Sequence, residues 1–105
     1  MTEHIIPVTL TERAIKEVKN IMLKKNIPQD YALRIGIKGS GGCGGFDYIL
    51  GFDQKKGNDL EYVLKEIPIL IEKKHTMYLL GLEVDFVENT EGRGFTFVKA
   101  EEENR

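Results

Sequence analysis

Apolar and polar residues alternate in two long segments of this chain, as they do in half-buried β-strands. The first segment covers residues 31–38 and the second covers 46–52, and a run of glycines separates them. Because the side chains of a strand point alternately to its two faces, Arg34 and Lys38 should lie on the face opposite to the core. The core-facing residues of the first segment would be Tyr31, Leu33, Ile35 and Ile37.

Shorter apolar runs predict further strands on both sides of this pair. Pro68 lies in one of them, and since proline has no N–H to donate, we expect that strand at a sheet edge or at a bulge. The further predicted strands cover residues 4–8, 60–65, 67–71, 83–88 and 94–99.

A change of the apolar period from two residues to about 3.6 marks a helix near the N-terminus. Thr9 and Glu12 fit a capping box, in which the threonine caps the helix and the glutamate reaches back to it. We therefore expect an amphipathic helix over residues 10–25 and a short helix over 72–80 that stops at Gly81. The apolar face of the first helix would consist of Ala14, Ile15, Val18, Ile21 and Met22.

The order of these elements predicts an α+β fold that is rich in short strands. With 105 residues the chain has room for one hydrophobic core, so we expect a single domain over residues 1–105.

Composition and charge argue against several classes of function. The net charge is −2, and without a basic surplus we expect no nucleic-acid partner. No apolar run approaches the roughly 20 residues that cross a bilayer, so we expect no membrane association. Residues 1–7 lack the features of a signal peptide, and a single cysteine cannot form an internal disulfide. We therefore expect a cytoplasmic protein.

The candidate chemistry lies at residues 39–45, where five of the 11 glycines surround the only cysteine, Cys43. The spacing G-x-G-x-x-G also occurs in dinucleotide-binding loops, but those open a helix, whereas a predicted strand follows here. A Walker A loop would need a lysine where Gly45 stands. A loop with few side chains can expose a thiolate and point backbone N–H groups at it. We expect Cys43 to bind a metal or cluster, and the alternative is a small buried thiol.

An enzyme with Cys43 as its nucleophile is a less favoured hypothesis. Such an enzyme needs a general base, and no local signature ties either histidine, His4 or His75, to Cys43. His75 stands among charged residues, where we expect a solvated surface side chain. A thioredoxin-type redox site would need a second cysteine. We therefore expect a protein that is not an enzyme.

Several segments occur together, in this order and at about these spacings, in one known family. They read VTLT (8–11), LRIGI (33–37), GCGGFDYIL (42–50), YLLG (78–81), VDFV (84–87) and GFTF (94–97). In these segments the chain resembles the HesB/IscA-like family, the A-type iron–sulfur carriers. The resemblance covers nearly the whole chain. It implies that family's fold, a compact β-rich sandwich with flanking helices.

The resemblance also implies a function. Members bind iron or an iron–sulfur cluster and pass it to apo iron–sulfur proteins, or work with a cluster-assembly scaffold, and they generally form homo-oligomers. By this resemblance Cys43 would be the metal ligand, and Gly42 and Gly44 would complete the binding loop. The alternative is a binding or regulatory module that keeps the fold but has lost stable cluster binding.

The chain departs from the family pattern at the ligands. The family has one cysteine in the glycine loop, matched by Cys43, and a Cys-x-Cys pair near the C-terminus, where this chain reads EEENR (101–105). The glycine loop is also one residue longer, with Gly44 where a serine is common. Since four thiolates normally hold a cluster, any bound cluster or iron should be labile. Its other ligands would come from further chains, a small thiol such as glutathione, His75 or the tail carboxylates.

Overall fold

The computed structural model describes residues 7–39 and 46–99. Within these residues, no helix has both the length and the apolar character needed to cross a membrane. The elements follow in the order β1 (Val8–Leu10), α1 (Glu12–Lys24), β2 (Tyr31–Lys38), β3 (Asp47–Gln54), β4 (Asp59–Leu64), β5 (Ile67–Glu72), the 3₁₀ helix η1 (Lys73–His75), α2 (Thr76–Leu79), β6 (Leu82–Asn89) and β7 (Gly92–Lys99).

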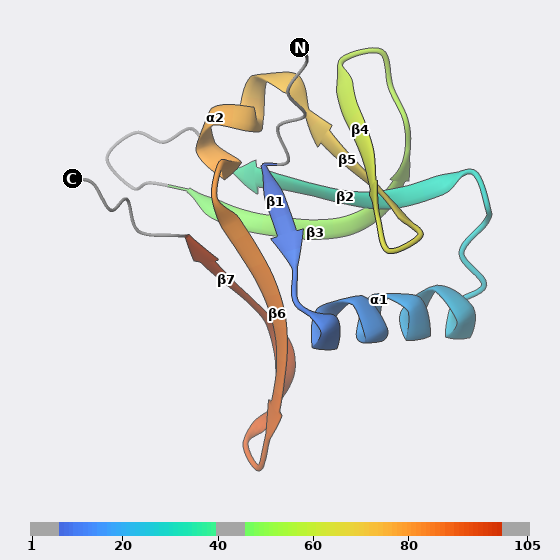
Figure 1. The fold of residues 1–105 in the computed structure, drawn as a ribbon, viewed down its shortest axis with the longest axis vertical. Coiled ribbons are helices and arrows are strands. Elements are labelled where there is room, and N and C mark those ends of the chain that lie inside the picture. Colours follow the sequence, from blue (N-terminus) through green and yellow to red (C-terminus); the bar gives the residue numbers. More distant parts are fainter. Residues whose placement is uncertain (1–6, 40–45, 100–105) are drawn as a thin grey trace.

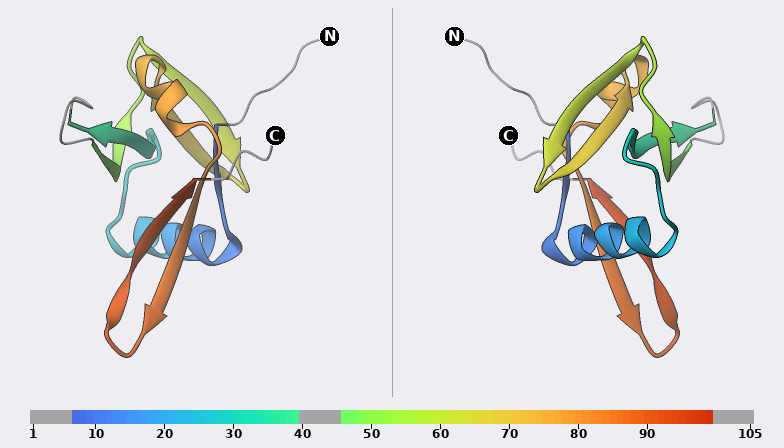
Figure 2. Two further views of the ribbon diagram at one scale, coloured as in Figure 1. Left: turned by 90° about the vertical axis from the view of Figure 1, so that its left-hand side faces the viewer. Right: turned by 90° about the vertical axis from the view of Figure 1, so that its right-hand side faces the viewer.

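The strands form two sheets (Figure 1). One has the order β1-β6-β7 and the other the order β3-β2-β5-β4, and the pairs β1–β6 and β2–β5 are parallel. Helix α1 packs against β1 and β6, and the hairpin of β6 and β7 extends beyond the helix (Figure 2). The strand-rich α+β class expected from the sequence is confirmed.

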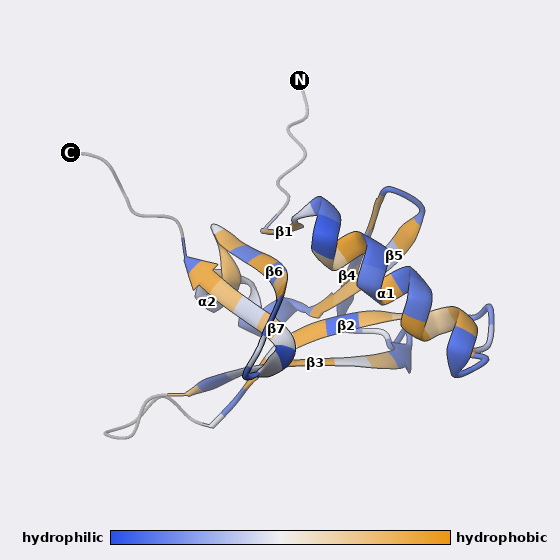
Figure 3. Cartoon of the chain, turned by 90° about the horizontal axis from the view of Figure 1, so that it is seen from below, coloured by the Kyte–Doolittle hydropathy of each residue, from blue (hydrophilic) through white to orange (hydrophobic). Residues whose placement is uncertain are grey.

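The core lies between the two sheets and α1. Helix α1 carries hydrophobic and hydrophilic residues in alternation along its turns, as an amphipathic helix does (Figure 3). Its residues Ala14 and Val18 are fully buried, whereas the other predicted members of its apolar face are half-buried. The buried cluster consists of Val8, Leu10, Ala14, Val18, Leu33, Ile35, Ile67, Ile69, Ile71, Leu79, Leu82 and Val84.

Strand β2 has the predicted bounds and the predicted alternation. Leu33 and Ile35 are fully buried, and Arg34 between them binds two carboxylates on the opposite face. That second face is also covered, since Ala32 and Gly36 are buried as well. The strand therefore lies in the interior of its sheet and is covered on both sides.

Helix α1 starts two residues later than predicted. Its N-cap is Thr11, whose side chain accepts a hydrogen bond from the Ala14 N–H at 3.1 Å, so the predicted cap at Thr9 is wrong. Thr9 belongs to β1, which pairs with β6, and the Thr11 N–H continues that pairing to the Val84 carbonyl at 2.9 Å. The predicted strand at 4–8 is therefore displaced to Val8–Leu10, and residues 4–6 lie outside the described part of the chain.

Strand β5 contradicts the prediction that Pro68 lies at a sheet edge or bulge. The strand is central, with β2 on one side and β4 on the other. Pro68 is paired with Val63 of β4, while the pairing with β2 begins only at Ile69. The missing N–H of Pro68 is tolerated because no β2 residue is paired with it.

The predicted short helix at 72–80 is present as η1 followed by α2. It stops at Gly81, whose φ of 82° lies in the left-handed region that favours glycine. The Gly81 N–H donates to the Pro7 carbonyl at 2.9 Å, which joins the end of α2 to the start of β1.

Candidate functional site

Cys43, Gly42 and Gly44 fall in the connection between β2 and β3, and all three lie outside the described residues. The last pair of the β2–β3 ladder is Lys38 with Asp47, so the structure describes both strand ends that hold this connection. A strand precedes the glycine run and a strand follows it, as the sequence predicted, which removes the dinucleotide-loop interpretation.

Gly39 shows why the run begins with a glycine. Its φ is 106°, a conformation that L-residues with a side chain rarely adopt. The chain therefore turns out of β2 at a position where only glycine is unstrained.

Four aromatic rings lie beside the two strand ends. Phe46, directly after the connection, makes edge contacts with Tyr48 at 5.5 Å and with Tyr78 of α2 at 5.3 Å between ring centroids. Tyr48 stacks on Phe97 of β7 at 5.5 Å. Aromatic pairs at these distances stabilise their arrangement beyond the burial of apolar area. The rings thus join β3, α2 and β7 at the position where the Cys43 connection re-enters the fold.

His75 covers the other strand of the hairpin. Its Nδ1 is 3.5 Å from the position that a Cβ on Gly36 would occupy. The His75 side chain is 21% exposed, with Nδ1 3.9 Å from Glu72 Oε1. The predicted solvated surface histidine is therefore only partly exposed, with its ring beside Gly36. Through His75 and Tyr78, the η1–α2 segment contacts both strands that hold the connection.

The end of β7 meets the same segment. Lys99 Nζ donates to the Tyr78 carbonyl at 2.8 Å. Figure 1 shows that α2, the end of β2, the start of β3 and the end of β7 lie at one end of the molecule. We call this the loop end. It assembles from segments that are far apart in the sequence.

The described residues offer no preformed metal site. Within 7–39 and 46–99, no group of three or more His, Cys, Asp or Glu side chains is arranged to hold a metal ion. His75 and Glu72 are only two such groups, and a cluster normally has four protein ligands. The described residues therefore supply at most part of a ligand set for a metal or cluster.

Away from the loop end, the charged residues on one face of β2 form a paired network. Arg34 binds both oxygens of Asp59, at 2.8 and 2.6 Å, and Asp53 at 3.0 Å. The Arg34 guanidinium and the Lys56 backbone N–H lower the pKa of Asp59 to about 2, against the effect of burial. The Asp59 side chain is 1% exposed. This network joins β2 to the start of β4, and its groups have partners already.

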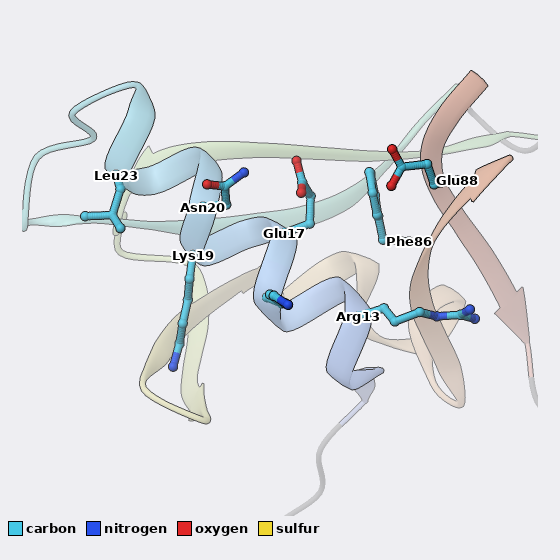
Figure 4. A pocket seen from close by; sticks show the side chains of 8 residues that line it. Arg13, Glu17, Lys19, Asn20, Leu23, Phe86 and Glu88 are labelled. Atoms are coloured by element: carbon cyan, nitrogen blue, oxygen red, sulfur yellow. The ribbon is translucent and has the colours of Figure 1, made fainter. Parts of the chain in front are cut away.

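A groove of about 670 Å³ runs between α1 and β6 (Figure 4). Several of its charged groups are also paired: Arg13 binds Asp85 at 2.6 Å, and Glu17 accepts from Arg93 at 3.3 Å. Hydrogen bonds from the Arg13 and Thr11 side chains lower the pKa of Asp85 to about 2. We interpret this groove as a feature of how α1 packs against β6, because carboxylates and guanidinium groups at the groove bind each other.

The sequence and the fold of this chain are similar to those of known proteins. Residues 6–101 match the family model described as iron-sulphur cluster biosynthesis. This chain belongs to that family. The assignment to the HesB/IscA-like carriers made from the sequence is confirmed.

Relatives by sequence cover most of the chain. The iron-sulfur cluster insertion protein ErpA of Mannheimia succiniciproducens is 40% identical over 96 residues, which are 90% of this chain and 83% of that protein. The mitochondrial iron-sulfur cluster assembly 1 homolog of Dictyostelium discoideum is 36% identical over 92 residues, which are 86% of this chain and 66% of that protein.

Solved structures share the fold. The crystal structure of IscA with the [2Fe-2S] cluster matches with a TM-score of 0.73 at 30% identity, covering 88% of this chain and 84% of the other. Escherichia coli SufA matches with a TM-score of 0.75 at 24% identity, covering 100% and 90%, and supports the fold alone. The expected HesB-type sandwich with flanking helices is confirmed.

The sequence alone did not reveal the neighbours of the connection. Phe46 and Tyr48 belong to one predicted strand, so their contact could be anticipated, but Tyr78 and Phe97 come from other elements. Gly36 within an alternating strand was a usable signal, because a glycine inside a strand often marks the close approach of another group.

Proposed function

We propose that this protein carries iron or an iron–sulfur cluster, bound through Cys43, and delivers it to apo iron–sulfur proteins or exchanges it with an assembly scaffold. The observation that carries the proposal is the family match over residues 6–101, which includes the cysteine of the glycine run. The printed names of relatives and neighbours support it, since they describe a cluster insertion protein and an IscA holding a [2Fe-2S] cluster.

Cys43 supplies the thiolate in this proposal, and Gly42 and Gly44 leave room for a cluster beside it. One cysteine per chain gives a quarter of the usual four thiolates, so the cluster would lie between protomers of a homo-oligomer. Small thiols, His75 or the tail carboxylates could complete the ligand set.

Incomplete coordination by one chain suits a carrier. A cysteine thiol of the acceptor loses its proton, its thiolate binds iron in place of Cys43, and the released Cys43 thiolate takes up a proton. Apart from the exchange of a thiol proton between the two cysteines, only bonds to the cluster are cleaved and formed, so the protein acts as a carrier and not as an enzyme. We place it in the cytoplasm, where a lone thiol stays reduced.

Anaerobic reconstitution with ferrous iron and sulfide tests the proposal. We expect charge-transfer absorbance in the visible range and about one cluster per two to four chains, as a single thiolate per chain requires. Cys43→Ser should abolish the absorbance. A parent protein that stays colourless would instead support a module that has kept the fold and lost the cluster. Absorbance retained in Cys43→Ser would show that the cluster binds elsewhere.

A further inference from the structure

We propose that the exposed surface of η1–α2 is the docking site for an acidic segment of the protein that receives the cluster. The proposal rests on the carrier function above and names the surface that function would use. We define the α2 surface as the apolar residues Met77, Tyr78 and Leu80 with the lysines Lys73, Lys74 and Lys99.

Apolar side chains are exposed here. A short helix that packs against the core normally buries its large apolar residues. Leu79 of α2 is fully buried. Its neighbours are not buried: Met77 is 79% exposed, Tyr78 42% and Leu80 43%. Three of the seven exposed large apolar residues of the described chain thus fall within four positions, and apolar residues that gather on a surface can mark an interaction site.

The patch adjoins the site that the carrier function needs. The Tyr78 ring contacts Phe46, which follows the Cys43 connection directly, at 5.3 Å between centroids. His75 of the same segment covers Gly36 on the preceding strand. A protein docked on the α2 surface would therefore lie next to Phe46, which is three residues from Cys43 in the sequence.

The charges of the α2 surface select the partner. Among the described residues, Lys74 reaches only its own neighbour Glu72 at 3.7 Å, and Lys73 forms no ion pair. Lys99 donates to a backbone carbonyl instead of a carboxylate. Lysines that have at most one long contact with a carboxylate, beside exposed apolar residues, fit a segment in which acidic residues flank an apolar one.

The same charges disfavour a second copy of this chain on the patch. In a two-fold dimer each surface meets its own image. Lys73, Lys74 and Lys99 of both copies would then lie in one interface, and like charges brought together at an interface are unfavourable. The other candidate is the chain's own tail, because Glu101, Glu102 and Glu103 follow Lys99 closely in the sequence.

The test measures binding without iron, so that its result does not depend on the carrier function. The probe is the apo form of an acidic plant-type [2Fe–2S] ferredoxin, titrated at low salt into the ¹⁵N-labelled full-length protein. We expect shifted amide signals at residues 73–80 and 98–99, and binding that weakens as salt is added. Cys43→Ser should bind the probe as the parent does. Failed reconstitution together with intact binding would therefore reject only the carrier function.

Two charge-reversed variants separate a local effect from a change of net charge. Lys73→Glu with Lys74→Glu should weaken binding at least fivefold. Lys16→Glu with Lys24→Glu, which changes two exposed lysines of α1 by the same charge, should stay within twofold of the parent. Equal weakening by both variants, or shifts centred on α1, would overturn the proposal.

Two further variants test the other two candidates for binding to the α2 surface, a second copy of the chain and the chain's own tail. Met77→Ser with Leu80→Ser should weaken binding of the probe and leave the sedimentation coefficient unchanged, and a loss of oligomer would assign the patch to a second copy. A chain that ends after Lys99 should bind as the parent does. Binding that appears only after this truncation would assign the lysines to the chain's own tail.

Discussion

The face of β2 around Arg34 and the surface of η1–α2 both carry charged side chains, yet only the first pairs them closely. Arg34 contacts Asp53 and Asp59, and the Asp59 side chain is almost completely buried. On the α2 surface, the shortest ion pair of a described lysine is 3.7 Å, and large apolar side chains remain exposed. The first arrangement stabilises the fold, whereas the second leaves groups available to a partner.

The two regions should also differ in how much a substitution changes the free energy of unfolding. Removing one partner of a buried ion pair lowers that free energy, since the other partner then remains as an uncompensated buried charge. An exposed lysine or methionine contributes little to it. Substitutions should therefore be costly around Arg34 and nearly silent at side chains of the loop end that do not pack, and the following predictions test that contrast.

Arg34→Ala should cause the largest loss. It leaves Asp59 buried without its guanidinium partner, so we expect the free energy of unfolding to fall by about 2–4 kcal/mol in urea titrations. Lys56→Ala is the matched control, because it removes only an exposed bond from Lys56 Nζ to Asp53 and should cost less than about 1 kcal/mol. Equal losses in the two variants would contradict the assignment of Arg34 and Asp59 as a stabilising pair.

Acid should weaken the ion pairs of Asp59 and Asp85, and this can be measured. The folded protein holds the pKa of Asp59 and of Asp85 at about 2, below the ordinary value of about 3.9. A lowered carboxyl pKa adds stability that is fully present above about pH 4 and is lost as the pH falls towards 2. The melting temperature should therefore drop over that range. Asp59→Asn should melt lower at pH 7 and show a flatter pH profile, and an unchanged profile would contradict the shift at Asp59.

Gly36 offers an intermediate test, since it lies between the core and the loop end. Its missing Cβ would lie 3.5 Å from His75 Nδ1, which is an ordinary contact, so Gly36→Ala should change the free energy of unfolding by no more than about 1 kcal/mol. Gly36→Val adds two methyl groups towards His75 and should cost about 1–3 kcal/mol. The imidazole NMR signals of His75 should move in the valine variant, and unmoved signals would place the ring elsewhere.

Cys43→Ser should have the smallest effect on stability. We expect its melting temperature to stay within about two degrees of the parent, because the residue is proposed to bind and not to pack. Differential scanning calorimetry of the iron-free proteins checks this. A drop of many degrees would show that Cys43 is a buried core residue, as the alternative interpretation of the sequence holds.

Alternation and glycine spacing determined a large part of this protein. They predicted β2 at its observed bounds, the strand after the glycine run and the approximate extent of α1, and together with the family segments they predicted the HesB-type fold. These features depend on the side chain and backbone freedom of each residue and on residues a few positions away, so they can be recognised in the local sequence. For the same reason the sequence pointed to Cys43 as the candidate ligand.

Tertiary structure decided the features that depend on distant partners. The pairing of β1 with β6 moved the cap of α1 from Thr9 to Thr11, and the late start of the β2–β5 pairing allowed Pro68 into a central strand. The partners of Arg34, and the meeting of Tyr78 with Phe46, come from elements far along the chain. Many pairings satisfy the same local pattern, and only the free energy of the assembled core selects one of them.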